Sequence, residues 1–184
     1  MAVTVDATVG GAEANSYLTV ADADDILDLR LGTSAWSSAS TDDKGRALIM
    51  ATRDIDSNRF QGERISSTQV LEFPRTYQRE AATEIPRDIQ FACAEQALWC
   101  LQNSATGGRS ERQQLRAEGV TSYTVGSLSE TLSDGISVGG GLSPDSARYL
   151  AGYLRNRTGR LIGPREQARY DFRDTRWRSG PFAP

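Results

Sequence analysis

The widest apolar surface in the sequence belongs to the stretch from Ile85 to Gln102. On a helix, its apolar side chains cover more than half of the circumference: Ile89, Cys93, Ala94, Ala97, Cys100 and Leu101. A helix on a protein surface has a narrower apolar stripe. Pro86 suits the first helical position, where its missing N–H has no intrahelical partner, and Asp88 complements the positive helix end. The pattern predicts a central helix at about 86–102 that is covered on several sides.

One narrower sector of this predicted helix mixes polar and apolar side chains. Its members are Arg87, Asp88, Glu95 and Gln102, with Phe91 and Leu98 projecting near them. A partly apolar sector on a helix that is otherwise covered is a candidate surface for another chain. We therefore expect Phe91 and Leu98 to contribute to an inter-subunit contact.

Two helices are predicted before the central one. Thr19 and Asp22 resemble a capping box with Asp in place of Glu, and the apolar positions that follow predict a helix at about 19–31. Thr41-Asp42-Asp43 begins a second helix at about 41–57. Its apolar stripe consists of Ala47, Leu48, Ala51 and Ile55.

The segments around these helices lack a clear period. Residues 32–40 are predicted to form a loop that contains Trp36, and residues 60–84 to be irregular. Three large apolar side chains in the second segment are expected to close one end of the helical core: Phe60, Leu71 and Phe73.

Between Val120 and Leu132 the hydrophobic pattern repeats every two residues, as in a β-strand, which predicts a β-hairpin. With Gly126-Ser127 as the turn, Val125 faces Leu128, Thr121 faces Leu132 and Tyr123 lies opposite Glu130. An isolated hairpin is marginally stable in water. We therefore expect the face with Tyr123, Val125 and Leu128 to form an inter-subunit contact.

These elements predict a mainly α fold, a small helical bundle with one β-hairpin and extended N- and C-terminal arms. The expected parts are a bundle core with its N-terminal arm (1–118), the hairpin and a glycine-rich linker (119–142), a C-terminal helix (143–163) and a basic, aromatic tail (164–184). Ser143 and Pro144 mark the start of the C-terminal helix as N-cap and first helical residue.

The composition fits one globular domain. The chain has 184 residues with 38% hydrophobic content, enough for one core. It has no apolar run long enough to span a bilayer and no signal peptide, so we expect a soluble protein without a membrane partner. Cys93 and Cys100 lie seven residues apart on one predicted helix, too far to pair within it, and are interpreted as small buried residues.

The charge is distributed unevenly. Residues 1–145 contain twelve basic and twenty-one acidic residues, a net charge of −9, whereas residues 146–184 contain nine basic and three acidic ones, a net +6. A negatively charged body repels nucleic acid, while a basic tail attracts an acidic partner. Only Lys44 is a lysine among the twenty-one cations.

The residues needed for common enzyme chemistry are missing. The chain has no histidine, which removes His-based acid–base catalysis, catalytic triads and His-ligated metals. The cluster Asp22, Asp24, Asp25 and Asp28 lacks the glycine of an EF-hand loop and is typical of a solvated helix start. Asp54, Asp56 and Glu63 are interpreted as ordinary acids rather than an acid–base pair. We expect no enzyme, no catalytic residue, no metal and no cofactor.

The tail leaves three interpretations open. Its arginines and aromatic residues could stack on single-stranded nucleic acid, dock as a folding-on-binding arm on a protein, or form an ordinary disordered terminus. The acidic body, Asp171 and Asp174 within the tail, and the near absence of lysine disfavour nucleic acid.

Several spaced stretches together resemble one protein family. They are residues 15–23 (NSYLTVADA), 47–56 (ALIMATRDID), 60–62 (FQG), 69–75 (QVLEFPR) and 85–86 (IP), with a looser echo at 119–133. Their order and spacing are similar to those of the head-to-tail connector (adaptor) proteins of tailed bacteriophages. Some members of that family are labelled DnaT-like single-stranded-DNA-binding.

The resemblance implies a structural protein of the virion neck, made in the host bacterial cytoplasm. It implies a homo-oligomeric ring, usually a dodecamer, that lies under the portal protein and above a stopper or tail-terminator type of protein. DNA passes through the lumen during ejection without sequence-specific binding. The expected portal-docking residues lie in the tail: Arg165, Arg169, Tyr170, Phe172, Arg173, Arg176, Trp177 and Arg178.

Two other functions stay open. The alternative is a DnaT-like protein that binds single-stranded DNA during replication, and a third option is a small-molecule-binding or enzymatic domain.

Overall fold

The computed structural model describes residues 2–77, 80–81, 83–108, 110, 114–115, 118, 122–125, 128–131 and 141–155. The chain divides into two units, Met1–Leu154 and Arg155–Pro184. All described residues except Arg155 belong to the first unit, and the following description concerns that unit.

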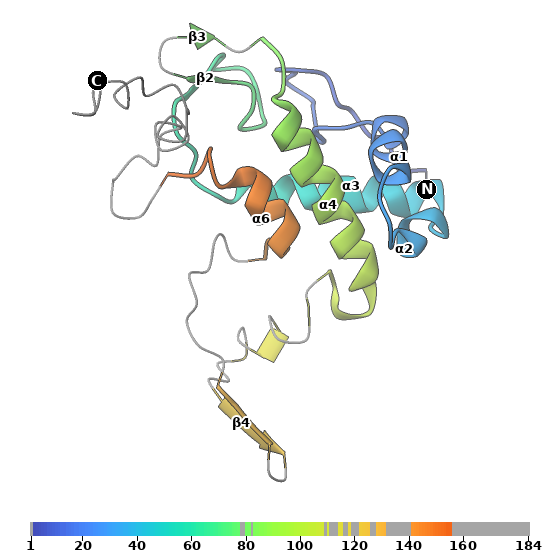
Figure 1. The fold of residues 1–184 in the computed structure, drawn as a ribbon. Helices are drawn as coiled ribbons and strands as arrows, with labels where there is room; N and C mark the ends of the chain where they lie inside the picture. Colours follow the sequence, from blue (N-terminus) through green and yellow to red (C-terminus); the bar gives the residue numbers. More distant parts are fainter. Residues whose placement is uncertain are drawn as a thin grey trace, which may run out of the picture. The chain divides into compact units, whose positions relative to one another are not determined.

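Helix α4 (Arg87–Gln102) is the central element (Figure 1). Helix α3 (Thr41–Asp56) and helix α6 (Pro144–Leu150) pack against it, as do α1 (Val20–Asp28) and α2 (Ser34–Ser37). Its buried residues therefore surround the helix axis: Ile89, Ala92, Cys93, Ala94, Gln96, Ala97, Leu98 and Cys100. The prediction of a central helix covered on several sides is confirmed, and a 3₁₀ turn η1 (Ser104–Thr106) follows it.

The predicted helix starts are correct to within one residue. Thr19 and Asp22 form the reciprocal capping box of α1. Ser40, one residue before the predicted start, caps α3, because its hydroxyl accepts from the Asp43 N–H at 3.1 Å. Pro86 is likewise the residue just before α4, and its carbonyl accepts from the Ile89 N–H at 2.9 Å.

Helix α1 ends at Asp28 and not near residue 31 as predicted. After Leu29 the chain turns so that Arg30 forms ion pairs of 3.0 Å with Glu95 and Asp145. Gly32 completes the turn with a φ of 80°, a backbone conformation that favours glycine.

The prediction of irregular structure at 32–40 and 60–84 is partly wrong. The first segment contains α2, and the second contains a small antiparallel sheet of β1 (Glu63–Arg64), β2 (Arg75–Tyr77) and β3 (Glu80–Ala81) in the order β1-β2-β3. Strands of two or three residues are too short to show a period of two in the sequence.

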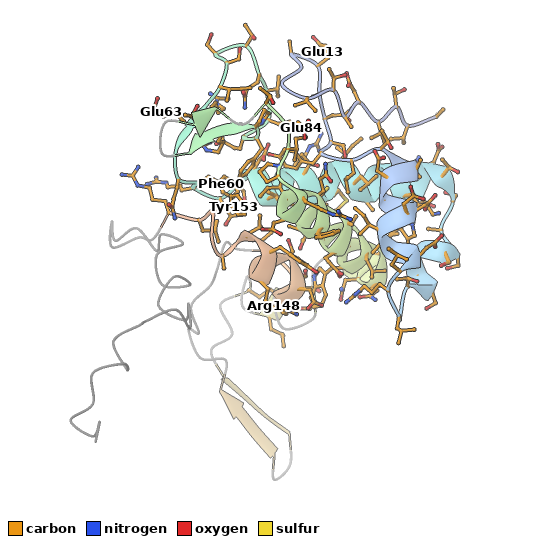
Figure 2. All side chains as sticks on the ribbon, turned by 45° about the horizontal axis from the view of Figure 1, so that its top comes forward. Glu13, Phe60, Glu63, Glu84, Arg148 and Tyr153 are labelled. Atoms are coloured by element: carbon orange, nitrogen blue, oxygen red, sulfur yellow. The ribbon has the colours of Figure 1, made fainter. Side chains whose placement is uncertain are left out.

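The three apolar residues expected to close the core are buried as predicted. Phe60 and Phe73 meet edge to face with ring centroids 4.8 Å apart, and Leu71 lies near them in the same core. Tyr153, after α6, packs on Phe73 at 5.8 Å. Figure 2 shows Phe60 and Tyr153 close together, where the Gln61 N–H donates to the Tyr153 carbonyl at 2.9 Å.

The hairpin consists of β4 (Ser122–Val125) and β5 (Leu128–Thr131). Its register pairs Val125 with Leu128 and Tyr123 with Glu130, as predicted. The predicted pair of Thr121 and Leu132 lies outside the described residues. The described residues form five α-helices and this hairpin, which confirms the mainly α fold class.

Ser143 and Pro144 start α6 as predicted, with the Ser143 hydroxyl accepting from the Ser146 N–H at 3.1 Å. The helix ends at Leu150, and Leu154 then forms a β-bridge with Phe60. Residues 156–163 of the predicted C-terminal helix lie outside the described part. Among the described helices, none is long and apolar enough to cross a membrane.

Candidate functional site

A buried hydrogen-bond network joins the N-terminal arm to α3 and to the 60–75 segment. The Tyr17 hydroxyl donates to Asp56 in a short hydrogen bond and accepts from the Phe73 N–H at 3.3 Å. The Glu72 N–H donates to the other Asp56 oxygen at 3.3 Å. Burial raises the pKa of Asp56 to about 6, and burial together with the Asp56 charge raises the pKa of Tyr17. Asp56 therefore holds two separate segments against α3.

A second set of contacts fixes the same segments. The Tyr17 N–H donates to the Thr52 hydroxyl at 3.3 Å. Arg75 donates to the carbonyls of Gln61 and Gly62 at 2.8 and 2.7 Å and forms an ion pair with Glu72. All of these residues lie within the spaced stretches 15–23, 47–56, 60–62 and 69–75 named above. Those stretches therefore contain residues that hold the fold together.

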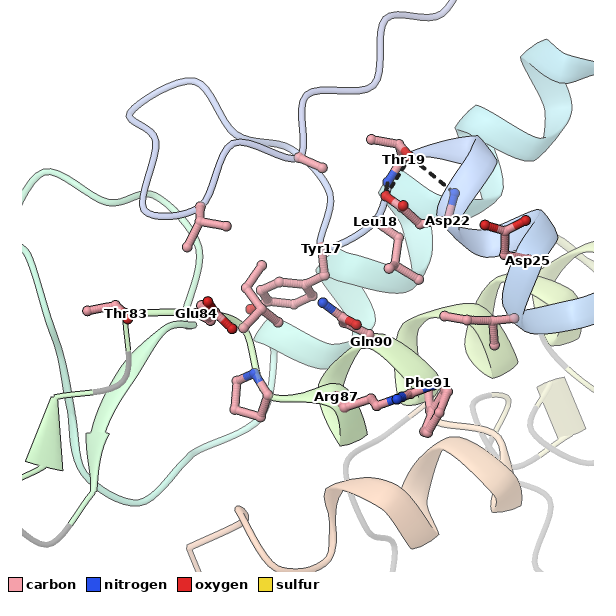
Figure 3. Close-up of a pocket in the computed structure, with 15 residues that line it drawn as sticks. Tyr17, Leu18, Thr19, Asp22, Asp25, Thr83, Glu84, Arg87, Gln90 and Phe91 are labelled. Carbon is pink, nitrogen blue, oxygen red and sulfur yellow. Dashed lines mark hydrogen bonds between the residues drawn. The ribbon is translucent and has the colours of Figure 1, made fainter.

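An open groove of about 830 Å³ lies between the N-terminal arm, α1 and the start of α4 (Figure 3). We call it the α1–α4 groove. Its apolar lining includes Val9, Leu18, Ile26, Ile85 and Phe91. Figure 3 shows Thr83 and Glu84 on one side, Asp22 and Asp25 on the other, and Gln90 between them.

The charges around the α1–α4 groove are mainly negative. Asp22, Asp25 and Glu84 line it together with one cation, Arg87, which lies over the Phe91 ring at 5.3 Å. Phosphate groups need cationic or N–H donors, so this arrangement disfavours a nucleic-acid backbone. The charge and apolar lining of the groove suit a neutral or cationic ligand that carries apolar groups.

Most basic side chains of the described body are paired with acids. Residues 2–77 contain seven basic and twelve acidic residues. Four of the seven form ion pairs: Arg30, Lys44, Arg46 and Arg75. A paired cation has little free charge to neutralise a phosphate backbone. Residues 2–77 thus offer no basic strip of the kind that binds single-stranded DNA.

The acidic residues of α1 point to different partners. Asp22 caps the helix, whereas Asp24 accepts from the Trp36 indole N–H and from Lys44, both at 2.7 Å. Asp25 lines the groove. Within the described residues, no three His, Cys, Asp or Glu side chains converge on a possible metal position.

Asp54, Asp56 and Glu63 also lie in different surroundings. Asp54 accepts from Gln96 at 2.9 Å, Asp56 belongs to the network with Tyr17, and Glu63 is exposed on β1. The structure therefore does not bring these three acids together as an acid–base pair.

Cys93 and Cys100 are free and buried, as interpreted from their spacing. Burial raises the pKa of each thiol to about 12, so neither is a reactive thiolate at neutral pH.

The predicted inter-subunit residues differ in accessibility. Phe91 is half-buried and contacts Tyr149, with ring centroids 5.5 Å apart. Leu98 is only 1% exposed, because α4 turns it into the core of the same chain, so it is not a surface for another subunit. Tyr123, Val125 and Leu128 occupy their predicted backbone positions in the hairpin. The eight predicted portal-docking residues, which lie between Arg165 and Arg178, are outside the described residues.

The sequence did not predict the α1–α4 groove. Its lining combines the arm around Val9, the α1 face with Asp25, and the Glu84 segment, which are far apart in the sequence. Asn15 folds the arm back by accepting from the Asp6 N–H at 2.9 Å and donating to the Thr4 carbonyl at 3.0 Å. An isolated asparagine in a polar arm gives no signal of that kind.

Comparison with known families gives one match. The model of a family described as "Putative DnaT-like ssDNA binding protein" matches residues 1–162. The searches of curated proteins and of solved structures give no match. The matched range covers the described body and ends before the predicted portal-docking residues.

Proposed function

The chain belongs to this DnaT-like family, and we propose that within it the protein works as a structural head-to-tail connector of a tailed phage neck. The proposal adds a phage role that the family description does not contain. The description itself fits the alternative, a single-stranded-DNA-binding protein, more directly.

The observation on which the connector proposal depends is the inward orientation of the resembling residues. Tyr17 and the Glu72 N–H both bind Asp56 on α3, and Arg75 donates to the Gln61 carbonyl within the 60–75 segment. These stretches therefore specify a scaffold, which is what a structural protein requires. A nucleic-acid-binding protein would be expected to present exposed basic and aromatic residues.

The charge of the body also supports this role. An acidic lining lets DNA pass without binding, because like charges prevent the phosphates from settling on the surface. Residues 2–77 contain twelve acidic and seven basic residues, and Arg30, Lys44 and Arg46 among the basic ones are paired with carboxylates. A protein that must retain DNA would need the opposite balance.

In the proposed assembly, copies form a ring, usually a dodecamer, between the portal protein and a stopper or tail-terminator type of protein. DNA passes through the lumen. The basic tail docks on the portal, with arginines pairing with carboxylates and aromatic residues as anchors. The proposed role needs no catalysis, metal or cofactor.

Capture by portal-bearing heads tests the proposal. Purified full-length chain is mixed with phage heads that hold their portal and, as the control, with heads assembled without it. We expect co-sedimentation with the first only, and closed rings at the portal vertex in electron micrographs. Equal binding to both kinds of head, or to neither, would overturn the connector function.

The tail is tested in the same assay with a chain that ends at residue 163. We expect an unchanged thermal midpoint and loss of capture, because the shortened chain keeps the described body. If the shortened chain is still captured, the tail is not the docking element. The next candidate is then the hairpin face with Tyr123, Val125 and Leu128.

The second candidate function is binding of single-stranded DNA, and the family description is the observation that favours it. It differs from the first in a measurable way, because it requires affinity within the matched residues 1–162. Oligonucleotide binding by the chain that ends at residue 163 separates the two candidates.

A further inference from the structure

The α1–α4 groove contains carboxylates that have no cationic partner within the described residues. Asp22, Asp25 and Glu84 line the groove, are exposed, and form no ion pair in the described part of the chain. Arg87 is the only described cation of the lining, so three acids and one base give the lining a net charge of −2. Asp22 and Asp25 lie on the α1 side, and Glu84 lies on the opposite side (Figure 3). Two added cations would neutralise the groove.

A neighbouring recess shows how carboxylates of this body are neutralised when an arginine is within reach. The recess, of about 580 Å³, shares Asp25 with the groove and continues it to α6. Its other two acids, Glu95 and Asp145, both pair with Arg30 at 3.0 Å. No such pairing reaches the described acids of the α1–α4 groove. Those carboxylates are therefore available to arginines from outside the body.

The groove also has an apolar part. Leu18, Ile26, Ile85 and Phe91 line it, and Ile26 and Phe91 are only half-buried. A second aromatic ring can pack against a partly exposed phenylalanine, offset or edge to face. The groove therefore fits a segment that carries an aromatic side chain together with two cations.

The C-terminal tail of the chain contains such a segment. Trp177 is preceded by Arg176 and followed by Arg178, and no other aromatic residue after residue 163 has an arginine on both sides. The nearest acid, Asp174, lies three residues before Trp177. Arginine pairs bidentately with carboxylates, and tryptophan and arginine are enriched among the residues that dominate interface energies. The two arginines match the net charge of the groove.

We propose that the segment Arg176–Arg178 of one copy docks in the α1–α4 groove of a second copy. Trp177 packs on Phe91, and its two neighbouring arginines pair with the carboxylates of the groove. The occupant is the tail of this protein, because the tail supplies both the positive charge and the aromatic ring that match the lining.

The tail is long enough to reach another copy. Trp177 lies 22 residues after Arg155, the last described residue, and an extended chain of that length spans roughly 75 Å at about 3.4 Å per residue. Tail and groove are different surfaces, so the contact is head-to-tail and leaves each copy one half for a further neighbour. The contact involves few residues and is smaller than a standard interface, so we expect it to be weak and reversible.

This inference goes beyond the proposed connector function and does not depend on it. Arg176, Trp177 and Arg178 are also expected portal-docking residues. If both proposals hold, the groove and the portal compete for the same segment. The groove then holds the tail of a neighbouring copy until the portal binds it.

Peptide binding to a full-length chain tests the contact. The acceptor is the chain with Trp177→Ala, whose own tail lacks the aromatic anchor, and the probe is a fluorescein-labelled peptide of residues 164–184. We expect saturable binding in fluorescence anisotropy. The same peptide with Trp177→Ala should bind about tenfold or more weakly, whereas the matched peptide with Phe182→Ala should bind within about twofold of the parent. Absence of saturable binding, or an equal loss from both changes, would overturn the proposal.

Charge reversal in the acceptor locates the binding site. Asp25→Arg together with Glu84→Arg should weaken peptide binding about tenfold or more at low salt, because it replaces two carboxylates by repelling cations. The matched control is Asp28→Arg together with Glu63→Arg. It changes the net charge equally at exposed positions that line neither the groove nor the recess, so it should weaken binding by less than about threefold. Equal effects of both pairs would overturn the assigned site, since net charge alone would explain them.

A charge exchange tests direct pairing. The peptide with Arg176→Glu and Arg178→Glu should bind the acceptor with Asp25→Arg and Glu84→Arg more tightly than it binds the acceptor with the natural groove. A preference of this peptide for the natural groove would contradict the pairing of these arginines with the groove.

Mixing two full-length variants shows whether a second copy is the occupant. The chain with Trp177→Ala keeps the groove, and the chain with Asp25→Arg and Glu84→Arg keeps the tail. Only the mixed pair has one intact groove and one intact tail, so native mass spectrometry should show heterodimers in excess of random pairing. Random pairing, or a parent chain that stays monomeric while its peptide binds, would overturn a second copy as the occupant.

The outcomes separate this inference from the proposed function. Peptide binding in the groove without capture by portal-bearing heads would contradict only the connector role. Capture by portal-bearing heads without peptide binding would contradict only the docking in the groove.

Discussion

Asp56 is a buried carboxylate with a structural role in the described body. It accepts hydrogen bonds from the Tyr17 hydroxyl and the Glu72 N–H, and burial raises its pKa to about 6. In the unfolded chain an aspartate loses its proton near pH 4. Between pH 4 and pH 6 the Asp56 carboxyl is mostly protonated in the folded chain and mostly ionised in the unfolded chain. The free energy of unfolding therefore decreases as the pH rises through this range.

Replacing Asp56 by Asn should therefore change how stability depends on pH. A pKa difference of two units corresponds to about 3 kcal/mol. Relative to Asp56→Asn, the parent chain should lose about 2 to 3 kcal/mol of unfolding free energy from pH 4 to pH 7. Urea denaturation of both proteins across this range measures the difference. A difference that does not vary with pH would show that Asp56 is not buried as described.

Asp43→Asn is the matched control. The Ser40 hydroxyl and then Arg46 lower the pKa of this exposed carboxyl. Its contribution is present above the unfolded pKa and is lost as the pH falls through the lower folded value. The stability advantage of the parent over Asp43→Asn should thus shrink at acidic pH, opposite to the trend for Asp56.

Leu98→Asp should destabilise the chain severely. Leu98 is enclosed in the core, and an unpaired charge there costs several kcal/mol. We expect no cooperative thermal unfolding of this variant. Val70→Asp, at an exposed position, should leave the thermal midpoint almost unchanged. A folded Leu98→Asp protein with the parent midpoint would contradict the helix orientation.

At the scale of elements, α6 is joined to the rest of the unit by the buried side chain of Gln96 on α4. Its amide donates to Asp54 at 2.9 Å and to the Gly141 carbonyl at 3.1 Å. Its carbonyl accepts from the Ser143 N–H, the N-cap residue of α6, at 2.7 Å. One side chain thus connects α3, α4 and the start of α6.

Gln96→Leu should loosen α6 more than any other element. The change leaves the Ser143 N–H and the Gly141 carbonyl without their partner, at a cost of about 2 to 4 kcal/mol. Hydrogen exchange should speed up for the amides of Ala147–Leu150 before those of α3. Gln90→Leu, half-exposed in the groove, is the control and should change stability by less than about 0.5 kcal/mol. Equal effects of both changes would refute the role of Gln96.

The sequence predicts the elements that have a local signal. Capping residues such as Thr19 and Ser143, and the apolar surface of α4, identify helices because their effects act within one turn. The β1–β3 sheet and α2 were missed, since each has too few residues to show a period. Leu98 was misplaced for a different reason: a helix wheel gives a direction, but the packing of α6 and α3 decides which directions are covered.

The α1–α4 groove shows the same limit at a larger scale. It is lined by residues from three segments that are far apart in the sequence, so no single stretch indicates it. The charge imbalance, in contrast, is a property of composition and could be counted directly. The count does not show that Arg30, Lys44 and Arg46 form ion pairs with carboxylates. Because of these ion pairs, the surface has fewer unpaired cations than the composition indicates.

For the whole molecule, DNA affinity distinguishes the two candidate functions. Residues 1–163 contain sixteen basic and twenty-one acidic residues, and the family match ends at residue 162. If the family description applies to this chain, its binding residues lie in that acidic part. If the connector proposal is right, any weak attraction to DNA comes from the five arginines after residue 163.

We therefore predict negligible affinity of the full-length chain for a labelled single-stranded oligonucleotide at physiological salt. At low salt, weak binding through the tail should appear in fluorescence anisotropy, and each phosphate contact should add about 0.7 to the slope of log K against log salt. A chain that ends at residue 163 should lose this binding entirely, because its net charge of −5 repels the phosphates. The full-length triple variant with Arg169→Ala, Arg173→Ala and Arg176→Ala is the matched control and should lose most of the slope. Micromolar, salt-sensitive binding by the chain that ends at residue 163 would instead establish DNA binding within the matched region and exclude an inert lumen wall.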